Sequence, residues 1–160
     1  MRRAARGWMR AGALGLLLAA ILGLCGTPQQ ARAEETAGYR AIVVSIGDQW
    51  LYAYEDDLLV FDAPVSTGRD GLDTPTGEFA IYAKLDMQTM SGNIDGEEYY
   101  VPDVPNVMYI YGGVALHGTY WHDMFGTGVR MSHGCINLPL DAAAWLYDWA
   151  DIGTPVTVID

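Results

Sequence analysis

The sequence predicts a mainly β domain that carries one helix near its C-terminus. Short β-branched and aromatic runs follow one another from residue 40 onward, and turns rich in Gly, Asp and Pro separate them. One later stretch repeats its apolar residues with helical spacing. No internal repeat or long Pro- or Ser-rich linker interrupts these elements, so residues 39–160 are expected to form one domain after a short lead-in at 34–38.

Three strands are expected first. Residues 41–46 form a β-branched run, residues 50–54 alternate aromatic and small side chains, and residues 58–65 are again largely apolar. The polar segments 47–49 and 55–57 fit tight turns between them. This order predicts a hairpin or meander with aromatic faces.

The middle of the chain mixes loops with further strands. Residues 66–77 are rich in Thr, Gly, Asp and Pro and are expected to form a loop, whereas residues 78–84 alternate as a strand does. Residues 86–98 are polar, which predicts a long surface loop of the kind that often serves as a lid. Strands are expected again at 107–111 and 114–117.

The helix is expected after Pro139, a residue that suits a first helical turn, with Asp141 near the positive end of the helix dipole. Gly153 should stop it, and residues 155–159 should form a final strand. Four residues spaced i, i+3, i+4 and i+7 make the stripe that should pack on the core: Ala142, Trp145, Leu146 and Trp149.

The first 33 residues have the composition of an export signal. Four arginines precede an uncharged stretch of about 16 residues at 11–26, and Ala31-Arg32-Ala33 offers the small residues that signal peptidases accept. A membrane-spanning helix needs about 20 residues. A retained anchor and, through Cys25, a lipoprotein are the alternatives. We expect cleavage after Ala33, no stable membrane insertion afterwards, and an exported protein in the periplasm, the cell wall or outside the cell.

Charge narrows the set of partners. Without residues 1–33 the chain keeps four basic and twenty acidic residues, a formal charge of −16. Binding to nucleic acid or anionic lipid requires basic patches. We therefore expect neither as a partner.

Cys135 would be the single cysteine left after signal cleavage. Exported proteins usually pair their cysteines, so a lone thiol is buried, pairs between chains or performs chemistry. His117 and His133 precede it, and an imidazole is the usual means of activating a thiol. Gly134 removes a side chain beside the nucleophile and leaves backbone N–H groups to stabilise an oxyanion.

Metal binding is the main alternative. Three histidines and Cys135 are ligand types that zinc accepts, but no Cys-x-x-Cys pair is present, and we expect neither a metal nor another cofactor. Each histidine also has a purely structural interpretation, as a turn cap or a satisfied residue at a strand end. We assign no chemistry to His122 or Trp121, which are expected to pack within a loop.

The segment Ser132-His133-Gly134-Cys135-Ile136-Asn137, with His117 eighteen residues before the cysteine, resembles the signature of the L,D-transpeptidase family. Ser66-Thr67-Gly68 and Thr74-Pro75-Thr76-Gly77-Glu78-Phe79 resemble earlier elements of that family. The resemblance covers about residues 38–160. It implies the family's β-sandwich, with the cysteine at the mouth of a groove, and here without a LysM or other peptidoglycan-binding module.

The resemblance also implies roles for individual residues. Cys135 is the acylated nucleophile, and His117 is the base and proton donor, oriented by the carbonyl of Gly118. His133 supports them. The backbone N–H groups of Gly134 and Cys135 are the oxyanion donors.

Five residues are expected to bind substrate. Tyr99 and Tyr100 are both candidates for a tyrosine that lies near the oxyanion in some relatives. Ser132 and Asn137 belong to the motif, and Asn137 closes it. Arg130, one of the four cationic residues outside the predicted signal, could hold a substrate carboxylate or could simply be a solvated loop charge.

By this resemblance, the protein is an L,D-transpeptidase that acts on peptidoglycan stem peptides through a thioester. An amine acceptor would give 3→3 cross-links or attach a protein to the wall, and water would give a hydrolase. Carbapenem-type β-lactams are expected to acylate the cysteine. A zinc hydrolase and a non-catalytic wall-binding module are the competing hypotheses.

Overall fold

The computed structural model describes residues 38–94 and 96–160, and the predicted signal peptide with its cleavage site lies outside them. Within these residues no helix is long and apolar enough to cross a membrane. The described elements are β1 (Arg40–Ser45), β2 (Trp50–Glu55), β3 (Leu58–Pro64), β4 (Gly77–Ala80), β5 (Ala83–Ile94), β6 (Glu97–Tyr111), β7 (Val114–Gly118), β8 (Ile136–Leu138), α1 (Leu140–Trp149) and β9 (Pro155–Ile159).

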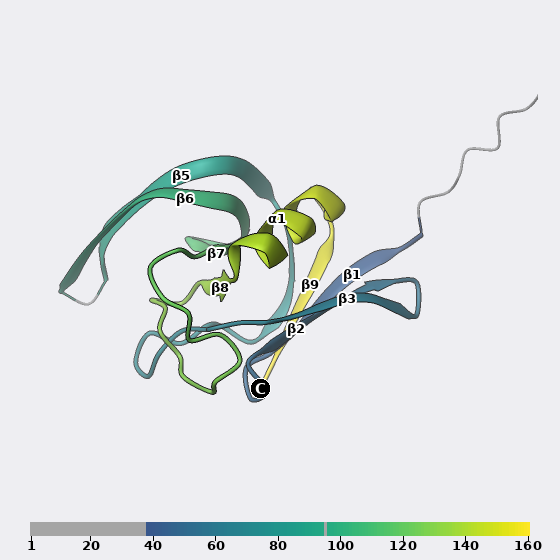
Figure 1. Ribbon diagram of the computed structural model, residues 1–160, viewed down its shortest axis with the longest axis horizontal. Helices are drawn as coiled ribbons and strands as arrows, with labels where there is room; N and C mark the ends of the chain where they lie inside the picture. Colours follow the sequence, from purple (N-terminus) through teal and green to yellow (C-terminus); the bar gives the residue numbers. More distant parts are fainter. Residues whose placement is uncertain (1–37, 95) are drawn as a thin grey trace, which may run out of the picture. The chain divides into compact units, whose positions relative to one another are not determined.

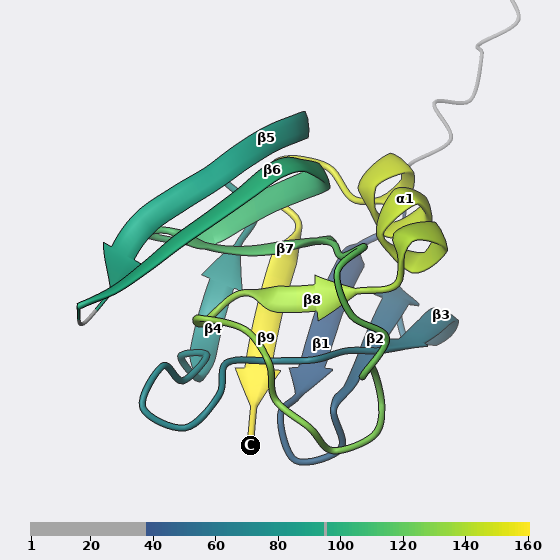
Figure 2. The same ribbon diagram turned by 60° about the vertical axis from the view of Figure 1, so that its left-hand side comes forward.

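Five strands form the first sheet, in the order β3-β2-β1-β9-β4. The expected meander is present, because β1, β2 and β3 pair antiparallel through short turns (Figure 2). The C-terminal strand β9 lies parallel to β1, with Ile42 opposite Val156, and antiparallel to β4. Alternate residues of the central strands are fully buried, which explains why the period-2 pattern predicted them correctly.

Four strands form the second sheet, in the order β5-β6-β7-β8. The core lies between the two sheets, since Ile42, Leu51 and Val156 of the first and Met108 and Leu116 of the second belong to one buried cluster. The predicted mainly β sandwich is confirmed. The short strand β8 pairs parallel with β7, which sets the segment after Cys135 beside the strand that carries His117.

The predicted helix is α1, and Pro139 occupies its N-cap (Figure 1). Of the expected stripe, Ala142 and Leu146 are buried, and the ring of Trp145 stacks on Phe61 with centroids 4.0 Å apart. The helix ends at Trp149, before the predicted stop, and the Lys84 ammonium donates to two carbonyls at its C-terminal end. A cation there complements the helix dipole.

Two expectations were wrong. Residues 86–98 are not a surface loop, because they contribute most of β5 and the start of β6, which pair as a long hairpin. Its stability comes from backbone pairing and its side chains are mostly exposed, so the sequence lacks the apolar alternation of a half-buried strand. The strand predicted at 78–84 is broken at residues 81–82, where the backbone changes partners from Thr154 in the turn before β9 to Tyr109 in β6.

Candidate active site

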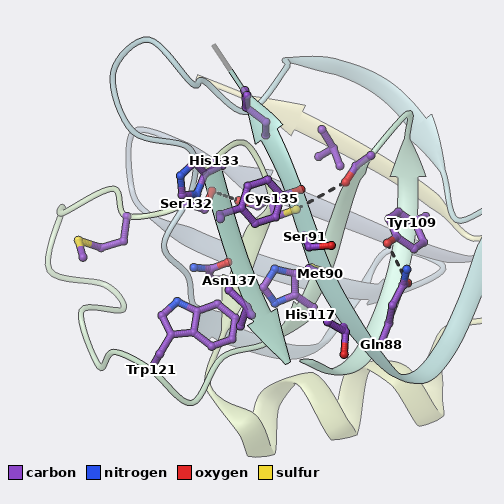
Figure 3. A pocket seen from close by; sticks show the side chains of 17 residues that line it. Gln88, Met90, Ser91, Tyr109, His117, Trp121, Ser132, His133, Cys135 and Asn137 are labelled. Carbon is purple, nitrogen blue, oxygen red and sulfur yellow. Dashed lines mark hydrogen bonds between the residues drawn. The ribbon is translucent and has the colours of Figure 1, made fainter. Parts of the chain in front are cut away.

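A cavity of about 550 Å³ lies between the β5–β6 hairpin and the segment 131–137. The hairpin contributes residues 88–91 and 94 and, from β6, Tyr99, Val101 and Tyr109. Figure 3 shows His117, His133 and Cys135 around this one cavity. The fold therefore brings together the three residues on which the sequence prediction centred, from β7 and from the turn before β8.

Hydrogen bonds hold the turn that carries Cys135. The Ser132 hydroxyl donates to the Cys135 carbonyl at 2.5 Å and accepts from the Gly134 N–H at 3.1 Å. The buried Thr74 hydroxyl donates to the Gly134 carbonyl at 2.9 Å and accepts from the Gly68 N–H at 2.8 Å. Gly134 has φ of +117°, a backbone conformation that side chains disfavour. Thr74 thus ties the Thr- and Gly-rich loop to the turn that carries Cys135.

These hydrogen bonds determine which of the expected oxyanion donors are already engaged. The Gly134 N–H, one of the two expected donors, is engaged by Ser132. No hydrogen bond within the described residues involves the Cys135 N–H. Of the two expected donors, the Cys135 N–H is thus the one available without rearrangement.

The Cys135 side chain is half-buried and packs against the small apolar cluster of Val104, Val107 and Ala115. Its Sγ lies 3.7 Å from the Gly113 carbonyl, to which the thiol donates. Burial raises the pKa of the Cys135 thiol above its ordinary 9.0, and a backbone hydrogen bond from Ala115 offsets part of that rise. The thiol is therefore protonated at neutral pH.

His117 is 2% exposed, at the end of β7. Its Nδ1 lies 3.1 Å from the Gly118 carbonyl, which can only accept, so Nδ1 carries the ring proton and Nε2 is an acceptor. Burial lowers the pKa of His117 to about 4, although the bond to Gly118 opposes the shift. The ring of Trp121, a residue to which the sequence assigned no chemistry, lies 5.8 Å from the imidazole and lines the cavity.

Burial raises the pKa of the thiol and lowers the pKa of the imidazole, and both shifts favour the neutral form. The site therefore holds a thiol and a neutral imidazole and not a thiolate–imidazolium pair. Such a pair can react by general-base catalysis, in which the imidazole takes the thiol proton as the sulfur attacks.

His133 is fixed from both sides. Its ring stacks on Tyr99 with centroids 5.2 Å apart, and its Nε2 lies 3.0 Å from a carboxylate oxygen of Glu97. Glu97 also forms an ion pair with Arg69. Neither Glu97 nor Arg69 lies near the Ser132–Asn137 motif in the chain, so no sequence pattern marks them as site residues.

Asn137 is 2% exposed and also lines the cavity. Its side-chain amide lies 2.9 Å from Nε2 of His122, while its other terminal atom, Oδ1, is buried without a hydrogen-bond partner. His122 therefore contacts a motif residue, a contact that its place in the sequence did not reveal.

Two of the expected substrate-binding residues lie outside the cavity lining. Tyr100 is 72% exposed, and of the two candidate tyrosines it is Tyr99 that lines the cavity. The Arg130 guanidinium pairs with Asp73 at 3.1 Å and also with Asp70. Within the part of the chain that the structure describes, no three His, Cys, Asp or Glu side chains are grouped to hold a metal.

Comparisons with known proteins agree with this geometry. The family model of the L,D-transpeptidase catalytic domain (YkuD) matches residues 39–158. The Probable L,D-transpeptidase ErfK/SrfK of Escherichia coli is 31% identical over 151 residues, which cover 83% of this chain and 48% of that protein. The chain thus spans about half the length of that curated relative.

Solved structures show the same fold. An L,D-transpeptidase from Mycobacterium smegmatis aligns with a TM-score of 0.71 and 31% identity, over 76% of this chain and 59% of that one. The L,D-transpeptidase LdtMt1 in complex with imipenem aligns with a TM-score of 0.71 and 26% identity, over the same shares of the two chains. Because the family model matches residues 39–158, most of the chain, this chain belongs to the family of L,D-transpeptidase catalytic domains.

Proposed function

We propose that this chain is a cysteine-dependent L,D-transpeptidase that acts on peptidoglycan stem peptides. The observation that carries the proposal is that a half-buried thiol, Cys135, and a neutral imidazole, His117, line one cavity. Because Nδ1 of His117 is held by the Gly118 carbonyl, Nε2 is the nitrogen available to a proton from sulfur.

Acylation follows from these protonation states. The thiol proton passes to Nε2 of His117 as the sulfur attacks the carbonyl carbon of the third residue of a stem tetrapeptide. The Cys135 N–H donates a hydrogen bond to the oxyanion. The Gly134 N–H can donate a second one if its hydrogen bond to Ser132 breaks. The C–N bond to the terminal D-alanine then breaks, and its amine takes the proton from His117. The products are a thioester on Cys135 and free D-alanine.

Deacylation reverses the proton path. The amine of a second stem gives a proton to His117 and attacks the thioester, so the acyl group moves to nitrogen and Cys135 recovers its proton. This acceptor yields a 3→3 cross-link, a lysine of a protein would yield attachment to the wall, and water would yield hydrolysis.

Three residues of the cavity are proposed to contact substrate: Tyr99, Ser132 and Asn137. Arg130 and Tyr100 could contribute only to a substrate that extends past the cavity, because neither lines it. The imipenem complex of a relative supports the proposal that carbapenems acylate Cys135. Export to the periplasm, wall or medium follows from the arginine-rich, apolar N-terminal segment.

Intact-protein mass spectrometry tests this function. The reduced protein incubated with imipenem should gain the mass of one drug molecule, and Cys135→Ala should gain none. Incubation with a stem tetrapeptide and an amine acceptor should release D-alanine, and a chelator should leave the rate unchanged. An unmodified mass of the reduced protein would contradict the proposal, and loss of activity on chelation would favour a zinc hydrolase.

A further inference from the structure

The outer half of the β5–β6 hairpin forms a wall of the cavity without a third strand beside it. The two strands pair from Ala83 opposite Tyr109 out to Ile94 opposite Glu97, whereas β7 pairs with β6 only near its C-terminal end, at 108–111. In Figures 1 and 2 the hairpin extends past β7. A two-stranded ribbon is only marginally stable by itself in water. The position of this wall therefore depends on side-chain contacts with the rest of the domain.

Glu97 makes such contacts at the tip of the hairpin, where it is the first residue of β6. One carboxylate oxygen pairs with Arg69 and the other lies 3.0 Å from Nε2 of His133. Arg69 belongs to the loop after β3, and His133 belongs to the turn that carries Cys135. Tyr99, two residues along the strand and on the same face, stacks on His133. The tip is thus joined to two separate segments of the site.

The chemistry of the groups shows which atom organises the cluster. An ionised carboxylate only accepts hydrogen bonds, so Nε2 of His133 carries a proton. Nη2 of Arg69 lies 3.4 Å from the same nitrogen, and since both are donors they converge on Glu97 and do not bond to each other. The hydrogen bond from His133 is the largest cause of a lowered pKa at Glu97, desolvation opposes it, and the hydrogen bond and charge of Arg69 add to the lowering. Glu97 is the acceptor that all of these contacts share.

The contacts are exposed to solvent, with side-chain exposures of 38% for Arg69 and 48% for Glu97. Exposed ion pairs add little to the stability of a whole domain. They can still decide a local equilibrium, because opening the hairpin tip disrupts far fewer contacts than unfolding the domain. The expected effect of Glu97 is therefore on the position of the hairpin and not on folding.

We propose that Glu97 is a positioning residue, which latches the tip of the β5–β6 hairpin to Arg69 and His133 and so limits access to Cys135. Loss of this Glu97 latch should let the hairpin open more often. It should expose the sulfur to small reagents and weaken the binding of a peptide that uses the hairpin as a wall. The peptide readout rests on the proposed function, whereas the accessibility of the sulfur does not.

Glu97→Gln is the test variant, because it keeps the shape of the side chain and removes its charge. Glu98→Gln is the matched control, since within the described residues Glu98 makes no ion pair or side-chain hydrogen bond. In hydrogen exchange, the amides of residues 90–101 should exchange about tenfold faster in Glu97→Gln than in the control. The amides of β1 and β9 should not change.

Two further measurements compare the same two variants, Glu97→Gln and Glu98→Gln. Alkylation of Cys135 by iodoacetamide at pH 7.5 should be several-fold faster in Glu97→Gln, and KM for a stem tetrapeptide should rise more than kcat falls. The exchanged pair Arg69→Glu/Glu97→Arg should return the exchange of the hairpin amides toward the wild-type rate, because an acid again lies between a guanidinium and His133.

The outcomes separate the two proposals. The latch is wrong if Glu97→Gln and Glu98→Gln have equal exchange and alkylation rates, or if faster exchange spreads through β1 and β9, which would indicate a general structural role. A wild-type protein that performs no acyl transfer, while its hairpin still opens on Glu97→Gln, would contradict the proposed function and leave the latch intact.

Discussion

The buried imidazole of His117 should make the stability of the folded domain fall in acid. The ring is 2% exposed and burial lowers its pKa to about 4, while in an unfolded chain a histidine titrates near 6.5. Between these values the unfolded state binds more protons than the folded state, so stability rises with pH. The contribution of His117 is fully present above pH 6.5 and is lost as the pH falls toward 4.

The size of the effect follows from the shift. A difference of about 2.5 pKa units corresponds to about 3.4 kcal/mol, at about 1.4 kcal/mol for each unit. Because each transition is spread over about two pH units, the expected loss from His117 between pH 7 and pH 4 is about 3 kcal/mol. This loss is a large share of the free energy of unfolding of a natural domain, which is about 5–15 kcal/mol.

Urea unfolding followed by tryptophan fluorescence measures this loss at pH 7, 6, 5 and 4. His117→Asn is the reference variant, because its side-chain amide can still donate to the Gly118 carbonyl but does not titrate. The stability of the wild type relative to this variant should fall by about 3 kcal/mol over that range. Equal pH dependence of the two proteins would refute the inference that burial holds the ring neutral, and with it the neutral base of the proposed mechanism.

Three other predictions use the same structure. The rate of alkylation of Cys135 by iodoacetamide should still rise above pH 9.0, because burial raises the thiol pKa, and a plateau by pH 7 would contradict a neutral thiol. Thr74→Val should leave two buried backbone groups unpaired and cost about 2–4 kcal/mol in urea unfolding, whereas the exposed Thr76→Val should change little. Lys84→Met should cost about 2 kcal/mol in thermal unfolding, because it removes the ammonium from the helix carbonyls, and an unchanged Tm would contradict that role.

The core strands were predicted from the sequence because their burial alternates. In β1, Ile42 and Val44 are fully buried, and the pattern of apolar residues reports that directly. The β5–β6 hairpin was missed because its residues are held by backbone pairing, which leaves no apolar pattern in the side chains. For the same reason, the polar residues 86–98 predict a loop where the structure has the outer part of this hairpin.

The residues of the site likewise divide into those that a sequence motif contains and those that only the fold brings together. Cys135, His133 and Gly134 adjoin in the chain, so a short motif contained them. Glu97 lies 36 residues before His133 and 28 residues after Arg69, and only the folding of the hairpin brings these three together.

His122 lies 15 residues before Asn137 and was expected only to pack within its loop. No sequence signal marked these contacts, because charged and polar residues in surface segments usually face solvent.

The sequence by itself determined the groups that the proposed mechanism uses: a thiol that would be unpaired after signal cleavage, a histidine proposed to take its proton and a glycine next to the cysteine. The tertiary structure decided their protonation states and partners. Burial makes both Cys135 and His117 neutral, Ser132 engages the Gly134 N–H, and Glu97 joins the hairpin to His133. The physical reason is that the kind of group is a local property of the chain, whereas a pKa or an ion pair depends on distance and on the exclusion of water.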